Sequence, residues 1–176
     1  MLYAGLILAV VAVGAVAYRI RSSSMQEAEA VRGAAACIRR EEVPVLAAEC
    51  ARTARERFGV ALDGGEIDAQ LKRVEELLRE DGDTGTSAFR EAFAGPGHPD
   101  RYVAVVGSLV GELLQDAGAA TWEAGPDAPV LRLTGGERRR VSPFAEVIRT
   151  VRQPGAAPLA CRLRGRPVRR KAPAVS

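Results

Sequence analysis

The sequence lacks the residue patterns that mark most catalytic and metal-binding sites. It has one histidine, His98, and three cysteines, Cys37, Cys50 and Cys161, with no C-x-x-C pair, so the usual zinc spacings are missing. The H-E-x-x-H, Walker A and G-x-G-x-x-G runs are missing too, and with them the sequence signatures of zinc protease, P-loop and dinucleotide sites. We therefore expect no metal ion, no cofactor and no catalytic residue that the sequence can identify.

Two segments resemble functional motifs and fail on inspection. His98 stands between a glycine and a proline, in a pattern typical of a rigid turn, so we expect an exposed side chain without a nucleophile close in sequence. Residues 81–86 carry aspartates at positions 1 and 3 of a calcium loop. A glycine follows at position 5, a threonine at 6 and an alanine at 12, so the pattern fails. We expect an acidic surface loop there.

Charge is absent from the start of the chain. The run from Leu2 to Tyr18 is uncharged and largely aliphatic, and as a helix it would span about 26 Å, close to the ~30 Å hydrocarbon core of a bilayer. Tyr3 and Tyr18 lie at its two ends, where their rings suit the headgroup zones. We predict a transmembrane anchor over residues 1–21 that contacts the bilayer through residues 2–18.

This run has two other interpretations, a cleaved signal peptide and a core helix. Ala15–Ala17 has the A-x-A form of a signal-peptide cleavage site, but no lysine or arginine precedes the apolar run, as a signal peptide requires. A core helix of a soluble protein would have a polar face, which the run lacks. The anchor is therefore favoured, and an exported protein is the alternative.

Arginines give the anchor a direction. Arg19 and Arg21 follow the run at once, while the short N-terminal side has no lysine or arginine. The positive-inside rule then places the N-terminus outside and the remaining chain in the cytoplasm. Arginine is strongly preferred over lysine, with much alanine, glycine and valine, which is typical of a GC-rich bacterial coding sequence. In that compartment we expect reduced, mostly buried cysteines, and a Cys37–Cys50 disulfide only if the topology is reversed.

Residues 22–164 are expected to form a single cytoplasmic α+β domain, with a mostly helical half followed by a small antiparallel β-meander and a C-terminal helix. Hydrophobic periodicity and capping residues predict the helices and strands. The expected helices cover residues 24–40, 44–58, 67–80, 87–94, 101–116 and 143–152. The expected strands cover residues 120–123, 130–133 and 137–141, with a last one at 159–164.

Some of these elements carry sharper expectations. The helix over 101–116 is the most apolar and is the candidate for the centre of the core, with Gly118 after its end. Pro44 suits the first turn of the second helix, whose apolar face would present Val45, Leu46, Ala48 and Cys50. Ser142 and the proline after it suit the start of the helix over 143–152.

Basic residues gather towards the C-terminus. From Arg138 onward there are eleven basic side chains and one acidic one, Glu146. This excess is typical of contact with an anionic surface or an acidic partner, or else of a solvated charged edge and tail that keep the strand edge from aggregating. The segment 165–176 has little to bury and is predicted to be a disordered basic tail. The candidate contact residues are Arg138, Arg139, Arg140, Arg162, Arg164, Arg166, Arg169, Arg170 and Lys171.

The function predicted from these features is that of a single-pass, membrane-anchored, non-enzymatic interaction or assembly module with a protein partner and possible contact with anionic lipid. One alternative is a membrane-tethered enzyme whose site comes from residues scattered in sequence. Another is a nucleic-acid-binding regulator that uses a basic hairpin, which is disfavoured because no preceding helix has a basic face.

Overall fold

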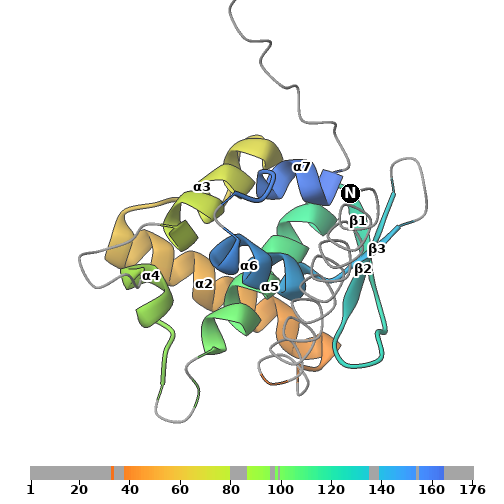
Figure 1. The fold of residues 1–176 in the computed structure, drawn as a ribbon, viewed down its shortest axis with the longest axis horizontal. Helices are drawn as coiled ribbons and strands as arrows, with labels where there is room; N and C mark the ends of the chain where they lie inside the picture. Colours follow the sequence, from red (N-terminus) through yellow and green to blue (C-terminus); the bar gives the residue numbers. More distant parts are fainter. Residues whose placement is uncertain are drawn as a thin grey trace, which may run out of the picture.

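The structure is a computed structural model, which describes residues 33, 38–79, 87–95, 98, 100–134, 139–153 and 155–164. This part of the chain is an α+β fold, built from helices and one three-stranded antiparallel sheet (Figure 1). In chain order, the elements are η1 (a 3₁₀ turn, Arg40–Glu42), α2 (Val43–Phe58), α3 (Ile67–Arg79), α4 (Ala88–Glu91), α5 (Arg101–Asp116), β1 (Ala120–Glu123), β2 (Val130–Leu133), β3 (Arg140–Val141), α6 (Pro143–Arg152) and α7 (Leu159–Arg164).

Several predicted segments lie outside the described residues. These are the anchor at 2–18, most of the first helix, the acidic loop at 81–86, the Gly135–Gly136 turn and the basic tail at 165–176. Within the residues that are described, no helix is both long enough and apolar enough to cross a bilayer.

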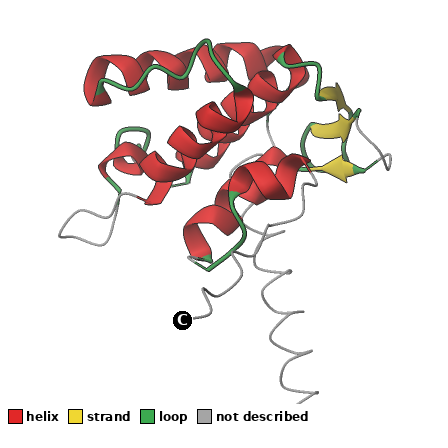
Figure 2. Cartoon of the chain, turned by 90° about the horizontal axis from the view of Figure 1, so that it is seen from above, coloured by secondary structure: helices red, strands yellow, loops and turns green. Residues whose placement is uncertain are grey.

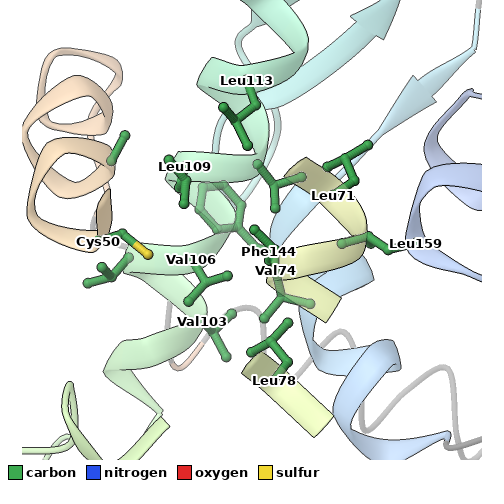
Figure 3. Packing of buried hydrophobic residues seen from close by; sticks show 14 of the residues in the cluster. Cys50, Leu71, Val74, Leu78, Val103, Val106, Leu109, Leu113, Phe144 and Leu159 are labelled. Atoms are coloured by element: carbon green, nitrogen blue, oxygen red, sulfur yellow. The ribbon is translucent and has the colours of Figure 1, made fainter. Parts of the chain in front are cut away.

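Helix α5 is the centre of the core and has the predicted bounds. Most of its residues are buried, and it packs against α2, α3, α6 and β1. Figure 3 shows side chains of α5, such as Val106, meeting Cys50 of α2 on one side and Val74 of α3 on the other. Because neighbours surround the helix, it has almost no polar face, as the sequence indicated.

Two glycines let aromatic rings approach α5 closely. Phe144 of α6 lies against Gly107, and Trp122 of β1 lies against Gly111 one turn later. The two ring centroids are 6.2 Å apart. A Cβ atom at either glycine would overlap the ring, so the G-x-x-x-G spacing holds α6 and the sheet against the central helix.

The sheet lies at one end of the helical group (Figure 2). Its strands are antiparallel in the order β1-β2-β3, the predicted meander. Trp122 of β1 pairs with Leu131 of β2, which pairs with Val141 of β3. Leu131 and Val141 are buried and Trp122 is partly buried in the core, so one face of the sheet packs on the helices and the other faces solvent.

Bounds of β1 and β2 match the prediction, whereas β3 is shorter than expected. The predicted strand ran from Glu137 to Val141, and the structure assigns only Arg140–Val141. Residues 135–138 lie outside the described part, so the predicted two-residue turn is not tested.

The residues predicted at three helix ends, Pro44, Ser142 and Gly118, lie at those ends in the structure. Pro44 lies in the first turn of α2, which ends at Gly59 with a left-handed φ of 68°. Ser142 caps α6, because its hydroxyl oxygen accepts a hydrogen bond from the Ala145 amide at 3.2 Å. Gly118 has φ +65° just after α5, which a residue with a side chain rarely adopts.

The predicted apolar face of α2 is wrong at two of its four positions. Cys50 is buried and Leu46 is half-buried against the core, but Val45 is 68% exposed and Ala48 is exposed. The buried residues are Val43, Ala47, Cys50 and Ala54. They repeat at i, i+4, i+7 and i+11, the true stripe of a helix, whereas the predicted set bunched residues that point to different sides.

The predicted last strand, residues 159–164, is instead the short helix α7. Leu159 and Leu163, one helical turn apart, are both fully buried. Helix α3 holds both ends: Glu75 Oε2 accepts a hydrogen bond from the Leu159 amide at 2.8 Å, and Asp68 Oδ1 accepts one from Arg164 Nη1 at 2.7 Å. A helix of six residues is not stable alone, and these tertiary contacts were invisible to a local pattern.

The helix predicted over 87–94 is reduced to α4, Ala88–Glu91. Its two aromatic residues are nevertheless in the core: Phe89 and Phe93 are buried, and their rings meet edge to face with centroids 5.2 Å apart. The Ser87 hydroxyl donates to the Leu77 carbonyl at 2.6 Å, which ties the start of α4 to α3.

Candidate functional site

The solvent face of the sheet carries an arginine pair, which we call the sheet arginines, Arg132 and Arg140. They are directly opposite each other across β2 and β3, and Thr121 of β1 is opposite Arg132. The sheet arginines are 50% and 69% exposed. Like charges directly opposite on neighbouring strands destabilise a sheet, so this pair is a cost to the fold.

One carboxylate partly offsets that cost. Glu123 at the end of β1 receives Arg132 Nε on one oxygen at 3.2 Å and Arg140 Nε on the other at 2.8 Å. Its own side chain is only 21% exposed. Two guanidinium groups share a single carboxylate, so this face keeps a net positive charge with donors turned to solvent.

The other predicted contact residues, besides Arg140, divide into three groups. Arg139 is exposed and donates a hydrogen bond to the Arg162 carbonyl of α7, so strand alternation places its side chain on the face opposite Arg140. Arg138 lies outside the described residues, as do the four basic residues of the tail, Arg166, Arg169, Arg170 and Lys171. The remaining two, Arg162 and Arg164, are in α7.

Arg162 is an interior residue. Its side chain is 10% exposed and binds Glu146 Oε2 of α6 at 2.6 Å, Thr150 Oγ1 at 2.5 Å and the Ala157 carbonyl. Arg164 binds Asp68 of α3 and is 26% exposed. Both side chains join α7 to neighbouring helices, so their guanidinium groups already have acceptors within the fold.

Neither Arg132 nor Glu123 was among the predicted contact residues. A signal was available, because strand alternation places Arg132 of β2 on the face opposite Leu131. Arg132 stands alone in the sequence, whereas the predicted contact residues came from clusters of basic residues. Glu123 could be placed beside both arginines only once the strand register was known.

A second polar cluster, which the sequence did not indicate, is centred on Trp122. Its ring nitrogen donates to Glu112 of α5 at 2.7 Å, and the Arg40 guanidinium lies 5.4 Å from the ring centroid, a cation–π distance. Arg40 also donates to Gln115 at 3.1 Å. A hollow of about 370 Å³ opens beside this cluster, between Ile38 and the β1–β2 loop.

Two larger hollows lie on the helices. One, of about 990 Å³, follows α3 and the α2–α3 loop, where basic and acidic residues such as Arg79 and Glu76 alternate. The other, of about 490 Å³, runs between α2 and α5. His98 lines neither, nor the hollow beside Trp122.

The structure describes His98 and two of the three cysteines, Cys50 and Cys161. His98 is exposed, as predicted, and its amide donates to the Gly95 carbonyl at 2.9 Å. Burial, and then the charge of Glu49, raise the pKa of the Cys50 thiol, so this thiol is neutral and unreactive. Cys161 is half-buried with a free thiol, and Cys37 lies outside the described residues.

In the described ranges, no group of three or more histidine, cysteine or acidic side chains is placed to hold a metal ion. Comparison with known protein families, with curated proteins and with solved structures gave no match.

Proposed function

We propose that this chain is a single-pass, membrane-anchored, non-enzymatic interaction module at the cytoplasmic face of a bacterial membrane. In this proposal residues 2–18 hold it in the bilayer with the N-terminus outside. The solvent face of the sheet, with Arg132 and Arg140, contacts anionic lipid headgroups. That contact sets the orientation in which the module presents its other surfaces to a protein partner.

The observation that carries this proposal is the opposition of Arg132 and Arg140 across β2 and β3. Such a pair costs folding energy, yet both guanidinium groups are exposed and, among the residues that the structure describes, share Glu123 as their one carboxylate. An anionic surface would supply the missing acceptors, because guanidinium groups donate well to phosphate oxygens.

The magnitude of the contact favours an orienting role over recruitment. An arginine near an anionic membrane contributes about 1 kcal/mol, so two arginines and one glutamate give roughly 1 kcal/mol. That is too little to bring a free protein to the membrane. It suffices for a domain that an anchor already confines to the surface, where the effective lipid concentration is high.

Energy transfer from Trp122 tests the proposal. Trp122 is the only tryptophan of the chain and lies in β1, next to Glu123. In proteoliposomes with dansyl-labelled headgroups, we expect more transfer from Trp122 in phosphatidylserine-rich vesicles than in phosphatidylcholine vesicles. High salt should remove the difference, because it screens exposed charges.

A matched pair of variants makes this result specific. The double variant Arg132→Gln/Arg140→Gln should lose the lipid-dependent difference. The control Arg52→Gln/Arg57→Gln removes the same charge from exposed positions on α2 and should keep it. Equal transfer in the two vesicle types for the unmodified protein, or equal losses in both variants, would contradict the contact.

A further inference from the structure

The hollow between α2 and α5 is an apolar groove with an acidic border. Leu62, Leu109 and Leu113 line its base, and Ala51 of α2 and Ile67 of α3 line its sides. Ala51 and Ile67 are only half-buried, so the groove offers apolar surface to an occupant. We call it the α2–α5 groove.

Three acidic residues border the α2–α5 groove: Asp63, Glu112 and Asp116. A hydrogen bond from Arg55 lowers the pKa of Asp63, which keeps this carboxylate ionised at neutral pH. Glu112 is the acceptor of Trp122 and has Arg40 3.6 Å away. Asp63 and Glu112 thus each have an arginine beside them, so within the described residues the uncompensated negative charge of the border is that of Asp116.

Asp116 is placed unfavourably unless a cation approaches it. It is the last residue of α5, a helix with no basic residue in its last turn. The carbonyl end of a helix carries partial negative charge and prefers cations. Asp116 is exposed and makes no ion pair with a described residue. A positively charged occupant would offset this local cost.

We infer that the basic tail of the same chain, residues 165–176, docks in the α2–α5 groove. The described chain ends beside it, since Arg164 binds Asp68 at 2.7 Å and Asp68 follows Ile67, which lines the groove. The extended segment 165–171 reaches about 22 Å, at ~3.1 Å per residue, which exceeds the ~18 Å that the five residues from Asp68 to Asp63 can span at most.

The order of apolar and basic residues in the tail matches the base and the border of the groove. Pro167 and Val168 come first and suit the apolar base, and Arg169, Arg170 and Lys171 follow and suit the acidic border. Attachment to the same chain gives the tail an effective concentration in the millimolar range, so individually weak contacts are enough to occupy the groove.

Docking has a consequence for the membrane surface. A tail held in the groove keeps its four basic residues away from anionic headgroups, and its release would add them to the surface contact. The inference does not depend on the proposed lipid contact of the sheet, because that contact uses Arg132 and Arg140 and not the tail.

Zero-length cross-linking tests the docking on the full, detergent-solubilised chain. A carbodiimide joins a carboxylate to an amine that touches it, and the chain has only two lysines, Lys72 and Lys171. Lys72 Nζ lies 3.4 Å from Glu76 Oε1, so that link is an internal positive control. We expect Lys171 to be joined to Asp63, Glu112 or Asp116, as identified by mass spectrometry of the digest.

Three comparisons make the outcome decisive. The links from Lys171 should fade in 1 M salt and disappear in Lys171→Arg, which keeps the charge but has no reactive amine, while the Lys72–Glu76 link persists. An equal mixture of unlabelled and isotope-labelled chains should give links within one copy. The inference is overturned if the Lys72–Glu76 link forms and Lys171 is joined only to other carboxylates or to none. Links only between copies would also overturn it.

Discussion

At the scale of single residues, the closest packing is at Gly111, where the Trp122 ring lies against the helix backbone. We predict that Gly111→Ala destabilises the protein by about 1–3 kcal/mol, the usual cost of overpacking a core, although alanine is the better helix former. Urea unfolding followed by Trp122 fluorescence measures this, and the native emission should also shift as the ring is displaced.

A neighbour on the same helix provides the control. The Ser108 hydroxyl is fully buried and has no hydrogen-bond partner in the described part of the chain. Ser108→Ala removes an unsatisfied polar group, so it should leave the free energy of unfolding unchanged or raise it by about 1 kcal/mol. If Gly111→Ala were as stable as Ser108→Ala, the close contact with Trp122 would be wrong.

Residue type alone could not sort the candidate contact arginines. Arg140 and Arg162 belong to two similar basic clusters in sequence, but the first is largely exposed on the sheet and the second is held by Glu146 in the interior. The distinction depends on which element each residue joins and what packs over it. Both follow from long-range contacts, since Glu146 is 16 residues away from Arg162.

At the scale of elements, local signals predicted the bounds of α5, β1, β2 and α6 well. These elements have either a long apolar pattern or a clear cap, such as Ser142 at the start of α6. The failures are short elements with few local signals. The strand predicted at α7 was wrong, because both ends of this helix depend on residues of α3, more than 80 positions earlier in the chain.

The dependence of α7 on Glu75 can be measured. Glu75→Ala leaves the buried Leu159 amide without an acceptor, at a cost of about 1–3 kcal/mol. We therefore predict that hydrogen exchange at the amides of α7 accelerates about tenfold or more, since 1.4 kcal/mol corresponds to a factor of ten in a local opening equilibrium.

Glu76 supplies the control for this prediction. It is the next residue on α3, is 62% exposed and pairs only with Lys72 within the described residues. An exposed i,i+4 pair contributes little, so Glu76→Ala should leave exchange in α7 unchanged. Equal protection of α7 in the two variants would show that Glu75 does not hold this helix.

At the scale of the whole molecule, ion pairs tie elements that are far apart in sequence. Arg101 at the start of α5 binds both carboxylate oxygens of Glu49 on α2 at 2.8 Å, a geometry that fixes orientation as well as distance. Arg40 of η1 binds Gln115 near the other end of α5. Through Arg40, η1 is thus joined directly to the central helix, and the orientation of the proposed anchor would decide which compartment the domain occupies.

That orientation leads to the last prediction, which concerns thiol accessibility in cells. With the proposed topology, a membrane-impermeant maleimide should leave the chain unlabelled in intact cells and should label it after permeabilisation. Cys161 is half-buried and free, whereas Cys50 is buried with a raised thiol pKa, so labelling depends on Cys161 and Cys37. The variant Cys37→Ser/Cys161→Ser should stay unlabelled even in permeabilised cells. Labelling of the unmodified chain in intact cells would reverse the proposed topology and place the sheet arginines on the outer side of the membrane.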